Sequence, residues 1–198
     1  MPFVLDGETL LAVEAGYTIF TDWRRRGYAA EMLAGFIAWA KSQGVAGLVL
    51  SIAPGNLASR ATAMVGKYCD GILPAAHAHT EADLALAELL KQTVTAADAA
   101  MVALDFSGGI VAVKEFVDAV NVYVTEQEPW ALAKDDANRD RLHTVLNTVC
   151  EALRAIAVLY NPVMPKAMES LWEQIGGQAN LGPLAAQRIE SAGTWSQL

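Results

Sequence analysis

The hydrophobic pattern of this chain changes its period at Pro54-Gly55. Before that point, apolar residues alternate from Leu10 to Phe20 as in a strand. Helical spacing follows from Tyr28 to Gln43, and Leu48 to Ile52 has the composition of a short buried strand. The pattern predicts a β-α-β unit with two parallel strands and a right-handed crossover. After Pro54-Gly55 the spacing stays helical, so the expected fold class is α+β and mostly α, with the small β-α-β unit followed by an up-down helical bundle.

Capping and breaking residues divide the bundle into about five helices. Asn56 can cap the first helix, and Thr80 with Asp83 forms a capping box at the start of the second. Ser107-Gly108-Gly109 is expected to separate the second helix from the third, and Pro165 to open the last. Four of the expected helices span about 56–68, 80–104, 136–160 and 165–175.

Apolar stripes on two of these helices indicate the core. They comprise Val113, Phe116, Val117, Val120 and Val124 on one helix, and Leu142, Val145, Leu146, Val149, Leu153 and Ile156 on the other. Spacings of three and four residues place each set on one helical face.

Composition favours a globular protein. Hydrophobic residues make up 54% of the 198 residues and charged residues 18%. No apolar run reaches the ~18 residues of a membrane helix, and no basic cluster precedes an apolar stretch at the start. We therefore expect a soluble, cytoplasmic protein without a membrane partner. Cys69 and Cys150 stand without a C-x-x-C pattern, so buried free thiols are expected.

The net charge of −8 is unevenly spread along the chain. Residues 56–198 hold 10 of the 14 basic and 17 of the 22 acidic residues. A protein of this charge does not attract nucleic acid at long range, so RNA recognition would depend on a few local contacts.

An arginine-rich turn, Arg24-Arg25-Arg26-Gly27-Tyr28-Ala29, leads into the first helical segment. A helix N-terminus with free N–H groups suits a pyrophosphate, and arginines pair with its oxygens. Together with Val13 to Ile19 and Asn56-x-x-Ser59, this turn resembles the GNAT N-acetyltransferases over about residues 8–60. The resemblance implies that Arg24, Arg25, Arg26, Gly27, Tyr28 and Ala29 contact the pyrophosphate of acetyl-CoA, with Asn56 further along that cofactor. The alternative is a solvated turn. Three strands and two helices that precede this segment in the family are absent, so catalysis is not expected.

Several spaced strings follow one another through the helical part. They are Asn56-Leu57-Ala58-Ser59-Arg60, Lys67-Tyr68-Cys69-Asp70-Gly71, Asn121-x-Tyr123, Glu128-Pro129-Trp130 and Tyr160-Asn161-Pro162-Val163-Met164-Pro165. In this order they resemble the anticodon-binding helical domain of methionyl-tRNA synthetase over about residues 56–178.

The synthetase resemblance implies that Asn56, Arg60 and Trp130 read the CAU anticodon of methionine tRNA. An indole stacks on an unpaired base, and amide and guanidinium groups address base edges. The alternatives are structural: Asn56 as an N-cap, Arg60 in an ion pair and Trp130 as a plug between helices.

No catalytic or metal site is expected. The synthetase signatures H-I-G-H and K-M-S-K-S occur nowhere in the chain, so it cannot charge tRNA. His77 and His79 lie on an expected loop without a third ligand, and His143 is expected on the polar side of its helix.

The expected domains are a GNAT-like fragment over 1–55, a synthetase-like bundle over 56–178 and a C-terminal tail over 179–198. The first hypothesis is a non-catalytic chimeric or recombined protein with a tRNA-binding module. The alternatives are a folded protein without native activity, and a coenzyme A binder or weak N-acetyltransferase. A two-stranded sheet leaves its edges open, so pairing of two copies into a homodimer is a further expectation.

Overall fold

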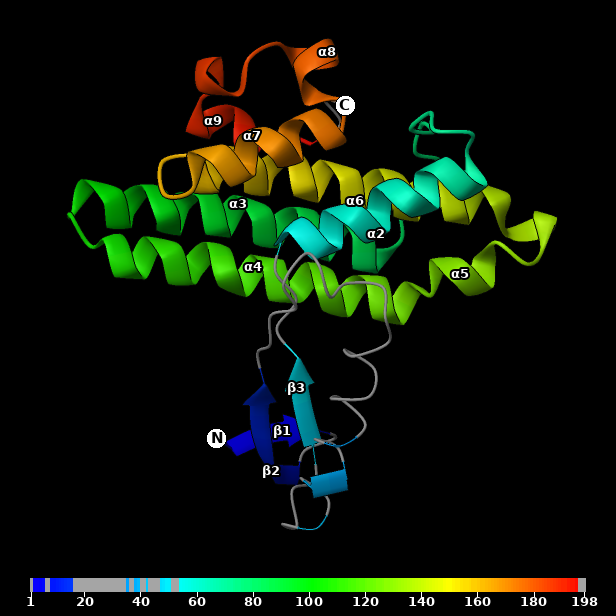
Figure 1. The fold of residues 1–198 in the computed structure, drawn as a ribbon, viewed down its shortest axis with the longest axis horizontal. Helices are drawn as coiled ribbons and strands as arrows, with labels where there is room; N and C mark the ends of the chain where they lie inside the picture. The colour runs from blue at the N-terminus through cyan, green and yellow to red at the C-terminus, as the bar shows by residue number, and fades with distance from the viewer. Residues whose placement is uncertain are drawn as a thin grey trace. The chain divides into compact units, whose positions relative to one another are not determined.

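The chain forms two compact units, Met1–Ser51 and Ile52–Leu198, in a computed structural model. The structure describes residues 2–5, 8–15, 35, 38, 39, 42, 47–50 and 54–195. Almost all of the second unit is therefore described, and the first is described mainly in its strands (Figure 1).

The strands of the first unit form one sheet in the order β1-β2-β3. β1 (Pro2–Leu5) pairs antiparallel with β2 (Glu8–Ala15), which pairs in parallel with β3 (Gly47–Leu50). The parallel pairing matches the expectation, whereas β1 was not expected. The crossover helix expected over 28–43 lies almost wholly outside the described residues, so the β-α-β unit as a whole stays a prediction.

The second unit is a helical bundle, as the sequence predicts. Its longer helices are α2 (Pro54–Tyr68), α3 (Glu81–Val102), α4 (Phe106–Gln127), α6 (Arg139–Tyr160) and α7 (Pro165–Gln174). Short elements follow α4 and α7: α5 (Pro129–Leu132), η2 (Asp136–Asn138), α8 (Gly177–Leu181), η3 (Leu184–Ala186) and α9 (Ile189–Ala192). Figure 1 shows α3 and α4 side by side as an antiparallel pair.

Helix α6 is the centre of this unit. It packs against α2, α3, α4, α5, α7 and α9, and every residue from Thr144 to Tyr160 is buried. The apolar stripes expected on α4 and α6 are buried as predicted. Among the described residues, Asp136–Tyr160 is the one segment long and apolar enough to cross a membrane, and 89% of its apolar window is buried inside the unit. Its apolar character thus fits a core helix.

The break between α3 and α4 lies before the position expected from the glycines. The chain turns at Ala103–Asp105, where Leu104 has a φ of 60°. Asp105 then caps α4, because its carboxylate accepts a hydrogen bond of 2.9 Å from the Gly108 amide. Gly108 and Gly109 thus belong to the first turns of α4. At Gly109 a Cβ would come within 3.0 Å of Met101, so this glycine lets α3 and α4 approach closely.

The segment expected as a tail packs onto the bundle as far as the structure describes it. The buried Arg154 on α6 donates hydrogen bonds to the carbonyl oxygens of Ala192 and Thr194, at 3.3 and 2.5 Å. Leu184 and Ala192 are buried in the main core. Residues 179–195 are therefore part of the folded unit.

Candidate nucleic-acid interface

Trp130 lies at a sharp corner of the chain between α4 and α6. Glu128 joins α4 to α5 with a φ of 42°, in the left-handed region. The buried Pro129 occupies the first turn of α5, where its fixed φ suits a helix start. Trp130 follows and keeps 39% of its surface exposed. Trp130 is therefore not a fully buried plug between helices, because part of its surface stays open to solvent.

A buried ionic network fixes the elements on both sides of this corner. The carboxylate of Asp83 on α3 accepts hydrogen bonds from both terminal nitrogens of Arg141 on α6, at 2.5 and 3.0 Å. It also accepts from the Tyr123 hydroxyl on α4 and from the Thr80 amide. Arg141 donates a further bond of 2.6 Å to Gln127 at the end of α4. The last turn of α4 and the first turn of α6 are thereby held together.

The network shifts the acidities of its members. Burial alone would raise the pKa of Asp83, but the hydrogen bonds from Arg141, Tyr123 and Thr80 lower it to about 2. Burial and the neighbouring Asp83 carboxylate raise the pKa of Tyr123. At neutral pH the site therefore holds an ionised Asp83 beside Arg141 and a neutral Tyr123.

Helix α2 carries Asn56 and Arg60. The helix begins at Pro54, so Asn56 is its third residue and not its N-cap, which corrects that alternative. Arg60 lies one turn further and is half-buried. Among the described residues, no carboxylate lies within ion-pair distance of Arg60, so the ion-pair alternative is not observed there either.

The second half of α2 and the end of α5 meet over the start of α6. A small apolar cluster of Val65, Leu142, Leu146 and Cys150 joins them, with Tyr68, Cys69 and Leu132 packed around it. Both cysteines are free thiols, as predicted, but only Cys150 is buried and Cys69 is half-buried. The helix that carries Arg60 and the short helix that carries Trp130 thus rest on the same stretch of α6.

Several lysines and arginines without an ion pair lie on the elements that surround the corner at Trp130. Among the described residues, Lys91, Lys114, Arg141 and Arg154 form ion pairs, and Arg188 has a further interaction. The five lysines and arginines without an ion pair in the described part are Arg60, Lys67, Lys134, Arg139 and Lys166. Four of them lie on or beside α2, α5 and η2, and only Lys166 belongs to α7.

Sequence reasoning missed Lys67, Lys134 and Arg139 as members of this surface. Two signals were available, because Lys67 stands in the string Lys67-Tyr68-Cys69-Asp70-Gly71 and Lys134 follows Trp130 by one helical turn. The sequence around Arg139 gives no such signal, because only the packing of α6 against α2 brings Arg139 to this surface.

The other predicted sites fare differently. Arg24 to Ala29, the expected acetyl-CoA loop, lie outside the described residues.

His77 and His143 contact each other with ring centroids 5.7 Å apart, and His77 Nε2 lies 3.6 Å from an Asp140 oxygen. No group of three or more candidate metal ligands occurs among the residues that the structure describes.

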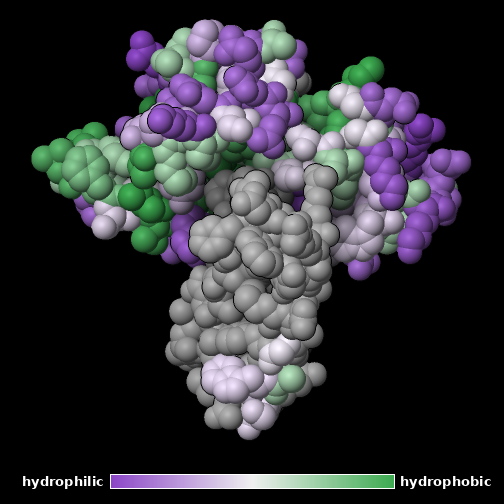
Figure 2. Space-filling view, in the orientation of Figure 1, coloured by the Kyte–Doolittle hydropathy of each residue, from purple (hydrophilic) through white to green (hydrophobic). Residues whose placement is uncertain are grey.

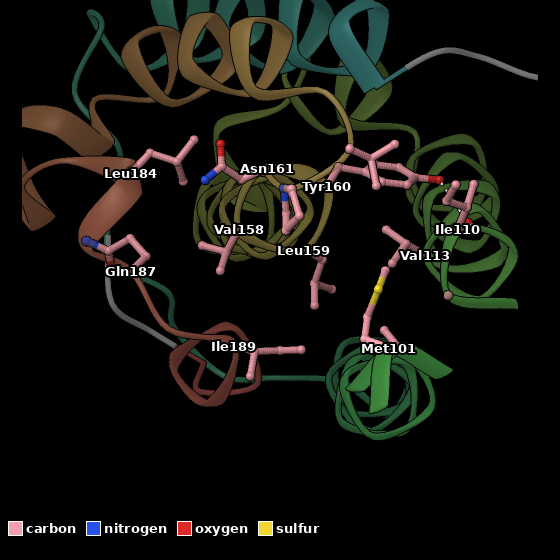
Figure 3. Close-up of a pocket in the computed structure, with 14 residues that line it drawn as sticks. Met101, Ile110, Val113, Val158, Leu159, Tyr160, Asn161, Leu184, Gln187 and Ile189 are labelled. Carbon is pink, nitrogen blue, oxygen red and sulfur yellow. Dashed lines mark hydrogen bonds between the residues drawn. The ribbon is translucent and has the colours of Figure 1, made fainter. Parts of the chain in front are cut away.

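An apolar cavity lies at the other end of the bundle. It measures about 160 Å³ and is lined by side chains from α3, α4, the end of α6 and the C-terminal segment. Figure 3 shows Met101, Val113, Leu159 and Ile189 around it, with the Tyr160 hydroxyl hydrogen-bonded to the Ile110 carbonyl. No charged side chain lines this cavity among the described residues, so it does not suit a nucleotide.

Two family models match the chain. Residues 73–190 match the anticodon-binding domain of methionyl tRNA ligase, and residues 3–64 match an acetyltransferase (GNAT) domain. Trp130 lies inside the first match, whereas Asn56 and Arg60 lie before it and inside the second. The chain therefore has two parts that resemble different families.

Methionine–tRNA ligases are similar to this chain over most of its length. The protein of Streptomyces coelicolor is 51% identical over 147 residues, which are 73% of this chain and 27% of that protein. The protein of Halalkalibacterium halodurans is 37% identical over 128 residues, 64% of this chain and 19% of that protein. The chain thus spans about a quarter or less of the length of these relatives.

Solved structures of methionyl-tRNA synthetase from Mycobacterium tuberculosis share the fold. The apo form has a TM-score of 0.58 and 30% identity, covering 60% of this chain and 24% of that chain. The form bound by methionyl-adenylate has a TM-score of 0.62 and 26% identity, covering 71% and 31%.

Proposed function

Because the chain belongs to the family of the anticodon-binding domain of methionyl tRNA ligase, we propose that residues 56–178 form a module that binds methionine tRNA through its anticodon. The observation that carries this proposal is Trp130, an indole 39% exposed at the corner between α4 and α6. Lys134 follows it by four residues, and Lys67 and Arg139 line a hollow together with Leu132 of the same short helix. The exposed part of the indole offers a face on which an unpaired base can stack.

Each residue has a distinct part in this recognition. The indole of Trp130 stacks on a base of the anticodon loop, where bases are unpaired and accessible. Arg60 and Asn56 form hydrogen bonds with base edges, because a guanidinium group supplies donors and an amide group supplies both a donor and an acceptor. Lys134 attracts a phosphate, which positions the loop without reading its sequence. Local cations thereby offset the repulsion expected from a net charge of −8.

Binding of methionine tRNA is the activity proposed for the helical unit, and no charging step is assigned to it. The chain spans about a quarter of the Streptomyces coelicolor ligase and contains neither H-I-G-H nor K-M-S-K-S.

A titration with RNA stem-loops tests the proposal. The full chain is titrated with a stem-loop that carries CAU and with the same stem-loop carrying an altered anticodon, at one stated salt concentration. We expect tighter binding of CAU, and Trp130→Ala should weaken it by about 5- to 150-fold because one stacked base contributes about 1–3 kcal/mol. Trp130→Phe should retain most of the affinity.

The control is Phe106→Ala, which removes an aromatic side chain that is 60% exposed at the far end of the bundle. It should bind like the wild type. Equal affinity for both stem-loops would contradict anticodon recognition.

A second function is favoured by the acetyltransferase match over residues 3–64. We propose that Arg24 to Ala29 give the chain affinity for the pyrophosphate of acetyl-CoA. A ligand that binds only the folded protein raises its melting temperature, so acetyl-CoA should stabilise the wild type and not a variant with Arg25→Ala and Gly27→Ala. A chain that responds to neither RNA nor acetyl-CoA would be a folded protein without native activity.

A further inference from the structure

A groove runs between the end of α2 and the start of α6, next to α5. Its volume is about 210 Å³. Lys67 and Tyr68 line it from α2, Leu132 and Ala133 from α5, and Arg139 and Leu142 from α6. We call it the Lys67–Arg139 groove.

Two cations face this groove from different elements. Lys67 is exposed, and its ammonium lies 5.1 Å from the centroid of the Tyr68 ring. Arg139 is exposed at the first residue of α6. Neither forms an ion pair with any residue that the structure describes. A cation at a helix N-terminus adds to the positive end of the helix dipole, so a bound anion would stabilise both.

Two aspartates also line the groove, and they limit what it can bind. Asp135 is engaged, because its carboxylate accepts a hydrogen bond of 3.0 Å from the Ala137 amide and caps η2. Asp136 is exposed to solvent. With two acidic and two basic side chains, the groove does not attract polyanions at long range. It suits a single phosphate that another contact has already brought near.

Trp130 provides that contact. Ala133 in the groove follows Trp130 by three residues, which is a rise of about 4.5 Å if the helical geometry of α5 continues to its end. Stacked nucleotides of one strand rise about 3.4 Å along the helix axis. The backbone distance from Trp130 to the groove thus corresponds to one or two stacked nucleotides.

We propose that the Lys67–Arg139 groove is a second ribonucleotide subsite, in which Lys67 and Arg139 hold the phosphate that adjoins the base stacked on Trp130. This inference rests on the proposed RNA binding and extends it to residues outside the anticodon-reading set. Because a phosphate carries no sequence information, the subsite adds affinity without adding anticodon preference.

Salt titrations of charge variants test the subsite. The CAU stem-loop and its altered counterpart are titrated against the wild type, Lys67→Gln, Arg139→Gln and the double variant at several salt concentrations. Each single variant should bind about 3- to 10-fold more weakly. The double variant should flatten the salt dependence by about 0.7 in the log–log slope, the value for one phosphate of a single strand. The ratio of CAU to altered affinity should stay unchanged.

The controls separate charge from position and from folding. Lys166→Gln removes a cation on α7 that has no ion pair among the described residues, and Lys91→Gln removes an exposed lysine paired with Glu88 on α3. Both change the net charge by the same amount as each groove variant. Both should bind like the wild type. Lys67→Arg should bind like the wild type, unlike Lys67→Gln, because it keeps the positive charge.

The outcomes distinguish this inference from the proposed function. If the wild type prefers CAU and the two groove variants behave like Lys166→Gln, the subsite is overturned and anticodon recognition stands. If the groove variants weaken binding but the wild type has no preference for CAU, the subsite stands and anticodon recognition is overturned. A wild type that binds neither stem-loop would overturn both.

Discussion

Asp83 joins three helices through one carboxylate. It lies on α3, is 1% exposed, and accepts hydrogen bonds from Tyr123 on α4 and Arg141 on α6. A buried carboxylate is costly unless it is paired and fully hydrogen-bonded. The network around it meets that condition at neutral pH, and so it ties the stability of the bundle to the charge of one residue.

Asp83→Asn should destabilise the protein by about 3 kcal/mol, because it leaves the Arg141 guanidinium without its partner. The wild type should also lose stability as the pH falls. The folded pKa of about 2 lies below the ordinary aspartate value of 3.8, so the contribution of Asp83 is complete above pH about 4 and disappears toward pH about 2. The loss amounts to about 2 kcal/mol. Urea denaturation at several pH values measures both effects.

The matched control is Asp98→Asn on the exposed side of the same helix. It should leave both the stability and its pH dependence close to those of the wild type. An Asp83→Asn variant that still lost stability between pH 4 and pH 2 as the wild type does would show that another group governs acid unfolding.

Sequence patterns specify buried residues better than exposed functional ones. The stripe from Val113 to Val124 was predictable because its spacing matches the helical period. The exposure of Trp130 was not, because it depends on the left-handed turn at Glu128 and on a network that includes Asp83, 47 positions earlier. Long-range packing of this kind leaves no local trace.

At the level of whole elements, helices with strong end signals were the most predictable. α3 begins after Thr80 as the capping box indicates, and α7 begins at Pro165. The glycine pair at 108–109 misled the prediction, because Asp105 caps α4 before it. The helical elements from Gly177 onward contain five residues or fewer, too short for a periodic pattern to show.

Two glycines should respond oppositely to the same substitution. At Gly177 a Cβ would lie 2.5 Å from atoms of the buried Trp172 ring, so Gly177→Ala should destabilise the protein by about 1–3 kcal/mol. At Gly66, inside α2, nothing lies within 4 Å, so Gly66→Ala should stabilise it by about 0.5–1 kcal/mol. Thermal unfolding of the two variants measures the difference. Equal shifts in melting temperature would refute the close packing of α8 on Trp172.

For the whole molecule, the C-terminal segment is a structural component. Arg154 and Glu151 are fully buried on α6 and form an ion pair of 3.2 Å, and Arg154 also binds the carbonyls of Ala192 and Thr194. A chain that ends after Arg188 loses both carbonyls and uncovers part of the core. We expect a loss of about 3 kcal/mol or more, because a buried charge would lose hydrogen bonds.

A chain that ends after Trp195 retains both acceptors and provides the control. It should unfold at the same urea concentration as the full chain. If both truncated chains were equally stable, the contacts of Arg154 with the C-terminal segment would contribute nothing to the fold.

Helix α2 lies partly in the acetyltransferase match by sequence and in the helical unit by structure. The acetyltransferase match extends to residue 64, well inside α2. Yet α2 packs against α6 and α7 within the helical unit. We propose that this helix is the junction of a recombined protein, since its Asn-x-x-Ser string fits both families. Such a junction needs only one helix whose apolar face, here Leu57, Ala61 and Val65, suits the second partner.

The distribution of unpaired cations has a consequence for how RNA would meet this protein. Hydrophobic side chains gather at the turn between α3 and α4, whereas the end that carries α5 is hydrophilic (Figure 2). Because Asp135 and Asp136 stand beside Lys67 and Arg139, and the net charge is −8, this end does not draw a polyanion from a distance. RNA would therefore be oriented only after it touches the protein, by short-range contacts with Trp130 and the neighbouring cations, and encounters elsewhere on the surface would not be held.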